Sequence, residues 1–215
     1  MTFLDKPPIV PDGFKLIAGA AIVTVLAGYF INAYAAAVPG ILTCFFIFFF
    51  RNPPRTIPAD ESALVAPADG KVMAVETVFE DTYLNQQCRK IVIFLSVFDA
   101  HVNRVPIAGT IKFQQYTCGR FIPAYKNGVG YENERCSIGI ENSHTNIMVT
   151  QIAGILARRI VSWVTLGDSL AHGQLYGMIK FGSCTEVYVQ DNVEITVQKG
   201  DHVRCGETII GRIIT

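Results

Sequence analysis

The chain has 215 residues and a formal net charge of zero, a length that suits one ordinary domain with a shorter appendage. Acidic and basic side chains are interleaved, so no basic stripe is available to follow a phosphate backbone, and we do not expect a nucleic-acid partner. The six cysteines form no CxxC pair and no zinc-type Cys/His spacing, so we expect free thiols and no metal site.

The first predicted element is an apolar stretch without any charged side chain, from Leu16 to Phe50. It exceeds the roughly 20 residues that cross a bilayer once as a helix, but barely suffices for two crossings and a turn. The Pro39-Gly40 pair predicts the break between its two halves. We therefore expect a hydrophobic helical hairpin at a membrane, either lying at its surface or inserted into it.

Basic residues flank this stretch, with Lys15 before it and Arg51 and Arg55 after it. The positive-inside tendency then predicts that both ends, and the domain that follows, lie on the cytoplasmic side of the cell membrane. A signal peptide fits poorly, because the apolar run is too long and no small-residue cleavage site is evident. A buried helical pair in a soluble core remains the alternative.

Several prolines after the apolar stretch predict a stiff linker that ends near Pro58. We expect residues 1–57 to form the membrane segment and linker, and residues 58–215 to form a catalytic domain. Ala153 to Arg159 could add a turn or two of helix. Short runs rich in Val, Ile, Tyr and Phe predict strands at Lys71 to Val78, Arg89 to Val97, Thr110 to Tyr116, Ser137 to Ile140, Asn146 to Ile152, Val161 to Val164 and Glu186 to Val189.

This spacing predicts a mainly β fold, an antiparallel sandwich or barrel-like domain. Two segments, Pro67 to Val72 and Lys199 to Ile213, each carry an Asp/Gly-type turn leading into a strand, and the second resembles the hairpins of biotinyl and lipoyl carrier domains. No Met-Lys-Met tip is present, so we expect the likeness to be architectural.

The most informative stretch for chemistry places Gly182-Ser183 between apolar, strand-like residues. Such pairs usually mark turns. Glycine nevertheless permits a strained backbone in which the following hydroxyl reaches the preceding carbonyl carbon, as self-cleavage between residues 182 and 183 would require. The attack would convert the serine into a pyruvoyl group.

Attack by a serine hydroxyl also needs a base and a group that orients the base. His101 follows the strand-like run IVIFLSV, so a strand end can position it, whereas Asp69 lies in a tight turn that would favour Asp for structural reasons alone. His144 and His202 fall in turns, and His172 is a reserve candidate in a polar loop.

With these residues identified, the chain resembles the short bacterial and archaeal type of phosphatidylserine decarboxylase along nearly its whole length. The likeness rests on ordered motifs: FFRxPxR at Phe49–Arg55, PADG at Pro67–Gly70, DxHVNRxP at Asp99–Pro106, NER at Asn133–Arg135, QIAGxxARRI at Gln151–Ile160 and FGS at Phe181–Ser183.

The resemblance implies self-cleavage into a β subunit, residues 1–182, and an α subunit, residues 183–215, which form a heterodimer and can assemble further. It places the cleaving serine at Ser183, the motif histidine at His101 and the turn aspartate at Asp69. Longer relatives carry a second histidine where this chain has Arg104, and CTE follows the cleavage site where RVD is common. We therefore expect His101 to serve both cleavage and decarboxylation.

In the implied reaction, phosphatidylserine forms a Schiff base with the pyruvoyl group and leaves as phosphatidylethanolamine and CO2. Arg104 and Lys180 are the predicted contacts of the substrate phosphate, alongside Arg51 and Arg55 as further candidates. A pyruvoyl enzyme for another amino acid and a noncatalytic membrane-anchored lipoyl-like module remain alternatives. A serine hydrolase fits less well, because no GxSxG elbow is present.

Overall fold

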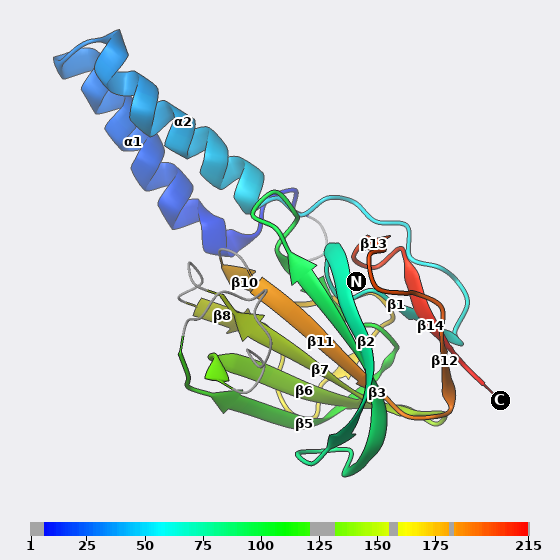
Figure 1. Ribbon diagram of the computed structural model, residues 1–215. Coiled ribbons are helices and arrows are strands. Elements are labelled where there is room, and N and C mark those ends of the chain that lie inside the picture. The colour runs from blue at the N-terminus through cyan, green and yellow to red at the C-terminus, as the bar shows by residue number, and fades with distance from the viewer. Residues whose placement is uncertain (1–6, 121–131, 155–158, 181–182, 215) are drawn as a thin grey trace. The chain divides into compact units, whose positions relative to one another are not determined.

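Figure 1 shows the computed structural model, which describes residues 7–120, 132–154, 159–180 and 183–214. The chain divides into two compact units, Met1–Pro54 and Arg55–Thr215.

The first unit is a hairpin of two apolar helices, α1 (Phe14–Phe30) and α2 (Ala33–Phe49), preceded by a 3₁₀ turn at Pro11–Gly13. The predicted hairpin is confirmed, but the predicted break at Pro39-Gly40 is wrong, because Pro39 lies inside α2. The chain turns at Ile31 and Asn32 instead. Asn32 is extended and its side-chain oxygen accepts a 2.8 Å hydrogen bond from the Ala35 N–H, which makes it the N-cap of α2.

By length and composition, one helical segment of the described chain, Pro11–Phe30, is long and apolar enough to cross a membrane. The second apolar helix, Ala33–Phe49, is shorter.

The second unit is built from antiparallel strands, which confirms the predicted fold class. Its largest sheet has the order β13-β2-β3-β11-β7-β6-β5-β9 and curls into a half-barrel (Figure 1). The strands of this sheet are β2 (Gly70–Glu80), β3 (Gln86–Leu95), β5 (Gly109–Thr117), β6 (Arg135–Glu141), β7 (Asn146–Ala153), β9 (Ser169–Leu170), β11 (Ser183–Val189) and β13 (His202–Val203).

Two three-stranded sheets complete the unit, with the orders β1-β14-β12 and β4-β10-β8. Their strands are β1 (Ala63–Val65), β4 (Val102–Arg104), β8 (Arg159–Ser162), β10 (Leu175–Lys180), β12 (Val193–Ile195) and β14 (Ile209–Ile213).

The core lies between the large sheet and the two small ones. Alternate apolar residues of β3 and β11, among them Ile91, Ile93 and Val187, pack in one cluster with Leu64 of β1 and Ile210 of β14. This alternation follows from the period of two along a strand. Strand β11 is buried along its whole length, since β3 and β7 flank it on both sides.

The longer predicted strands are all present, with ends that differ by up to three residues. In the small sheet, β8 begins at Arg159 rather than Val161, and in the large sheet β11 begins at Ser183 rather than Glu186. Ala153 ends β7, and residues 155–158 of the predicted helical turn lie outside the described residues. The two Asp/Gly-type segments pair with each other, because β13 lies beside the start of β2, with His202 opposite Lys71.

Candidate active site

Ser183 is the first residue of the central strand β11, opposite Leu95 of β3 and Ala153 of β7. Its side chain is fully buried, and its Oγ has no hydrogen-bond partner within the described residues. A buried hydroxyl without a partner costs about 1–3 kcal/mol, so a native fold seldom keeps one without a reason. The partner in the predicted cleavage, Gly182, lies outside the described residues.

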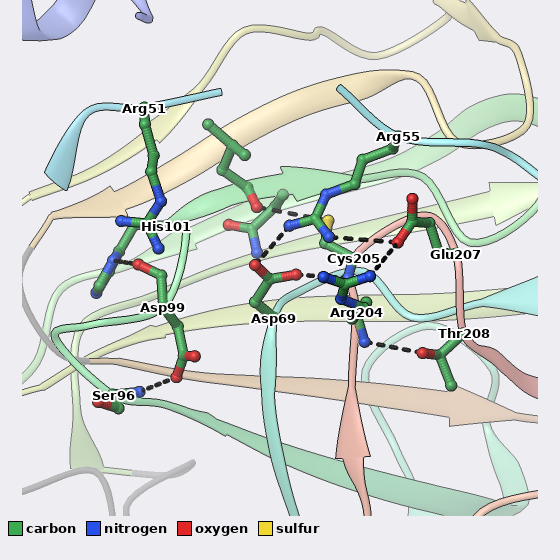
Figure 2. Close-up of polar contacts among 12 residues, drawn as sticks. Arg51, Arg55, Asp69, Ser96, Asp99, His101, Arg204, Cys205, Glu207 and Thr208 are labelled. Atoms are coloured by element: carbon green, nitrogen blue, oxygen red, sulfur yellow. Dashed lines mark hydrogen bonds and ion pairs between the residues drawn. The ribbon is translucent and has the colours of Figure 1, made fainter. Parts of the chain in front are cut away.

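His101 is held at the end of a tight turn that follows β3. The Asp99 carboxylate accepts a 2.7 Å hydrogen bond from the Ser96 N–H, and the Asp99 N–H donates back to the Ser96 carbonyl. The His101 Nδ1 lies 2.9 Å from the Asp99 carbonyl oxygen, as Figure 2 shows. Because a carbonyl oxygen only accepts, Nδ1 carries a proton and Nε2 is the basic nitrogen of the neutral ring.

Two backbone connections bring the His101 turn and the start of β11 together. Leu95, which precedes the turn, pairs directly with Ser183. At the other end of the turn, the His101 carbonyl accepts a 3.2 Å hydrogen bond from the N–H of Ile179, near the end of β10. The segment that carries His101 is therefore hydrogen-bonded to the chain both before and after the predicted cleavage point, at Ile179 and Ser183. His101 and Ser183 are brought together in this way although they lie far apart in sequence.

A buried polar layer extends from Ser183 along the interior face of the sheet, formed by Ser183, Thr185, Gln151 and Asn103, all fully buried. Thr185 lies opposite Gln151 in the β11-β7 pairing. Gln151 Nε2 donates to Asn103 Oδ1 at 2.7 Å, and Asn103 Nδ2 donates to the Pro67 carbonyl at 3.2 Å. Thr185 Oγ1 and Gln151 Oε1 have no partner within the described residues.

The polar layer of Ser183, Thr185, Gln151 and Asn103 requires a glycine on β10, a strand of the small sheet β4-β10-β8. A Cβ at Gly177 of β10 would lie 2.4 Å from the Val161 carbonyl oxygen and 3.0 Å from Gln151 Nε2. The amide of Gln151 thus packs directly on the backbone of β10, and any larger side chain at Gly177 would displace it.

Asp69 belongs to a second polar cluster, in which its two oxygens have separate partners (Figure 2). Oδ2 accepts from Arg55 Nη2 at 2.6 Å, and Oδ1 accepts from the Cys205 N–H at 2.7 Å. Glu207 lies 3.5 Å from Arg55 Nη1 and accepts a 3.1 Å hydrogen bond from the Thr56 N–H. Asp69 therefore joins the start of the second unit to its C-terminal turn, and the predicted contact with His101 is not among the partners that the structure gives Asp69.

The two predicted phosphate contacts have different surroundings. Arg104 is buried, and its Nη1 donates to the Gly173 carbonyl at 2.9 Å. Lys180, the last residue of β10, is partly exposed.

The cysteines are free thiols within the described chain, as predicted. Burial raises the pKa of Cys205 to about 12, and its Sγ lies 3.2 Å from the Pro67 carbonyl oxygen. Burial also raises the pKa of Cys184 well above its usual value. Both thiols are therefore protonated near neutral pH. Separately, the described residues contain no group of three or more His, Cys, Asp or Glu side chains that could hold a metal ion.

The remaining histidines differ in exposure. His144 is exposed in a turn, as predicted. His202 is also exposed, but it is the first residue of strand β13, so its predicted place in a turn is wrong. The loop residue His172 is partly buried, its Nε2 has no partner within the described chain, and desolvation lowers its pKa despite a hydrogen bond with the Pro106 backbone.

The sequence reasoning missed Asn103, Gln151 and Thr185. A signal was present, since Gln151 is the one polar residue on its face of β7, and Thr185 lies with Ser183 on a face of β11 that continues as valine. A polar residue on the buried face of a central strand indicates an internal hydrogen-bond network or a site.

Comparison with known proteins adds independent information. The family described as phosphatidylserine decarboxylase matches residues 42–211. A protein of Carboxydothermus hydrogenoformans named phosphatidylserine decarboxylase proenzyme is 49% identical, over 97% of this chain and 99% of that protein. Proteins of the same name from Symbiobacterium thermophilum and Geobacter metallireducens are 40% and 43% identical, with at least 96% of each chain covered.

Proposed function

The chain belongs to the phosphatidylserine decarboxylase family, and we propose that it converts phosphatidylserine to phosphatidylethanolamine and CO2 after cutting its own backbone before Ser183. The word proenzyme in the names of its relatives is consistent with such processing. The observation that carries the proposal is the Ser183 hydroxyl, which is fully buried at the start of the central strand, beside the segment that holds His101. It has no hydrogen-bond partner among the residues that the structure describes.

The cleavage would begin with attack of Ser183 Oγ on the Gly182 carbonyl carbon. The new C–O bond replaces the C–N bond, while the hydroxyl proton passes through a base to the released nitrogen. Elimination of the resulting ester leaves a carboxylate on residue 182 and a dehydroalanine at residue 183. Addition of one water and loss of one ammonia then leave the pyruvoyl ketone, so no oxidant is needed.

His101 is the proposed base and later proton donor. Its Nδ1–H is engaged by the Asp99 carbonyl, which fixes the ring and makes Nε2 the nitrogen that takes and returns a proton. Asp69, predicted to orient this base, contacts Arg55 and Cys205 instead of holding the ring, so we propose that it positions the site through the Pro67–Gly70 turn.

The surroundings of Ser183 suit a pyruvoyl group. Thr185 Oγ1 and Gln151 Oε1 are buried on the same sheet face and have no partner in the described part of the chain, so they can hydrogen-bond a small polar group or water. The group itself would supply a carbonyl that condenses with the substrate amine and accepts the electron pair released with CO2. The protein would exclude bulk water, orient the substrate carboxylate and return one proton.

Of the two predicted phosphate contacts, we retain Lys180 in the proposal. It is partly exposed at the end of β10, three residues before Ser183, whereas Arg104 is buried against the Gly173 carbonyl and suits a structural role better.

Cleavage would not release the C-terminal fragment. Strand β11 lies in the sheet between β3 and β7, and β14 pairs with β1, so the fragment of residues 183–215 stays hydrogen-bonded to the rest. We propose a heterodimer of residues 1–182 and 183–215, with residues 1–57 as membrane segment and linker, residues 58–215 as catalytic domain, and both hairpin ends on the cytoplasmic side.

The mass of the purified protein under denaturing conditions tests the proposal. We expect two fragments, the smaller with a blocked N-terminus and a carbonyl that borohydride reduces. Ser183→Ala should give one uncut chain, while Ser143→Ala, which changes an exposed turn serine, should cleave normally. An uncut parent chain would refute the proposal and favour a noncatalytic module, and cleavage with activity only toward a soluble amino acid would favour the other pyruvoyl class.

A further inference from the structure

The helical hairpin has a surface that water does not solvate well. None of the residues of α1 is buried, and exposed side chains surround both helices, with Val25 69%, Val38 75% and Ile41 71% exposed. No charged residue occurs between Leu16 and Phe50. An apolar surface of this extent, on all sides of a helix pair, matches the hydrocarbon of a bilayer.

The contacts between the two helices are of the kind that holds helices together in lipid. Thr24 Oγ1 and Thr43 Oγ1 lie 3.3 Å apart, and each hydroxyl also donates to the carbonyl four residues earlier, at 2.8 Å. A Cβ at Gly40 would lie 3.5 Å from the Thr24 methyl group, so the helices approach closely. The Thr24 and Thr43 hydroxyls are therefore hydrogen-bonded within the hairpin and need no partner from the acyl chains.

The two ends of the hairpin carry interfacial residues. At the tip, Tyr29 and Tyr34 are 81% and 90% exposed, on either side of the polar Asn32. At the open end, Lys15 immediately precedes the apolar stretch, and the Arg51 guanidinium lies 3.8 Å above the Phe48 ring. Tyrosine is enriched where a membrane meets water, and Lys and Arg are enriched on the cytoplasmic side.

The length of the hairpin decides how far the tip reaches. Each helix has 17 residues, so at about 1.5 Å per residue each extends about 26 Å. The hydrocarbon core is about 30 Å thick, and a bilayer thins locally around a short span at modest cost. A tip that stopped midway would leave the Tyr29 and Tyr34 hydroxyls and the Asn32 amide in hydrocarbon, which costs free energy.

We propose that α1 and α2 cross the whole bilayer as a closed hairpin and place Tyr29, Asn32 and Tyr34 in the opposite headgroup layer. The occupant of the apolar surface is the acyl-chain region of a phospholipid bilayer. This inference rests on the proposed membrane association, and it is independent of whether Ser183 becomes a pyruvoyl group.

Labelling of single cysteines in vesicles tests the depth. In full-length protein carrying Cys44→Ala and Cys118→Ala, the two exposed native thiols, we add one cysteine by Tyr34→Cys at the tip, Val25→Cys in mid-helix or Ser143→Cys on the catalytic unit. The protein is inserted into preformed vesicles of phosphatidylglycerol and phosphatidylethanolamine. A membrane-impermeant maleimide is supplied either outside or sealed in the lumen.

We expect the Ser143→Cys thiol to react only from outside, the Val25→Cys thiol from neither side and the Tyr34→Cys thiol only from the lumen. Reaction of the Tyr34→Cys thiol from outside would mean that the hairpin lies on the surface, and reaction from neither side would mean that it ends inside the bilayer. Either result overturns the proposal, as does failure to float with vesicles. Chain cleavage, and CO2 release from vesicles to which phosphatidylserine has been added, report separately on the proposed function.

Discussion

Asp69→Asn keeps the shape of the side chain at the Arg55 contact but removes its charge. The Asp69 and Arg55 side chains are only 14% and 7% exposed, and their 2.6 Å ion pair is supported by the Cys205 N–H on the other carboxylate oxygen. The asparagine oxygen can still accept one of these hydrogen bonds. Among the described residues, the cation of Arg55 would then keep Glu207 as its ion-pair partner, at 3.5 Å.

The expected loss follows from this geometry. Removing one partner of a buried ion pair typically costs about 3–5 kcal/mol, because the other charge stays desolvated. Since Glu207 remains and the asparagine still accepts a hydrogen bond, we expect the lower end, about 3 kcal/mol. For a chain of this size 1 kcal/mol lowers the unfolding midpoint by about 2–4 °C, so the midpoint should fall by about 6–12 °C.

The assay is thermal unfolding in detergent, in a Ser183→Ala background that we expect to stay one covalent chain. A double-mutant cycle with Arg55→Met should show coupling, so that the double variant loses less stability than the two single variants together. The control is Asp81→Asn, at an exposed turn residue, which should stay within about 0.5 kcal/mol of the parent.

A midpoint lowered by less than about 2 °C, or strictly additive losses, would refute the structural role that the ion pair gives Asp69. Rates of self-cleavage distinguish a positioning role of Asp69 from a direct one. They are measured with Ser183 intact, at a temperature well below the unfolding midpoints of both the Asp69→Asn and the Arg55→Met variants. If Asp69 acts only by positioning, Asp69→Asn and Arg55→Met should slow cleavage to a similar extent. A much larger effect of Asp69→Asn would instead favour direct participation with His101.

Three further changes test other parts of the structure. His101→Ala should leave the chain uncut or, if the chain is cut, without CO2 release, and a fully active variant would refute both proposed roles. Gly70→Ala should prevent soluble, folded expression, because Gly70 has a φ of +153° and a Cβ there would lie 2.1 Å from the Phe94 carbonyl oxygen. Burial lowers the pKa of His172 below its ordinary 6.5, so the unfolded chain binds the extra proton more readily than the folded chain. The contribution of His172 to stability is therefore present above pH 6.5 and is lost as the pH falls through the lower folded-state pKa. His172→Gln should flatten the acid side of a plot of the unfolding midpoint against pH.

The sequence predicted features that depend on residues near one another in the chain. An uncharged run predicted the helical pair, and short runs of β-forming apolar residues predicted strands β2, β3, β5, β6, β7, β8 and β11. The break in the hairpin was misplaced, since Pro39 is the stronger sequence signal while the cap at Asn32 depends on a hydrogen bond to Ala35. Strand β4 has too few residues for a period to show, and β10 shows no alternation because five of its six residues are buried.

The chemistry-bearing residue types and their motifs were likewise evident in the sequence, including Ser183, His101 and Asp69. Only the tertiary structure decided which side chains meet. It set Ser183 opposite Leu95, bound Gln151 to Asn103 across two sheets, and joined Asp69 to Arg55 and Cys205. Composition and periodicity are local properties of a chain, whereas strand register and the burial of a polar atom are fixed only when distant segments pack. Local patterns therefore predicted the helices and strands, and the packing of the sheets determined which side chains are partners.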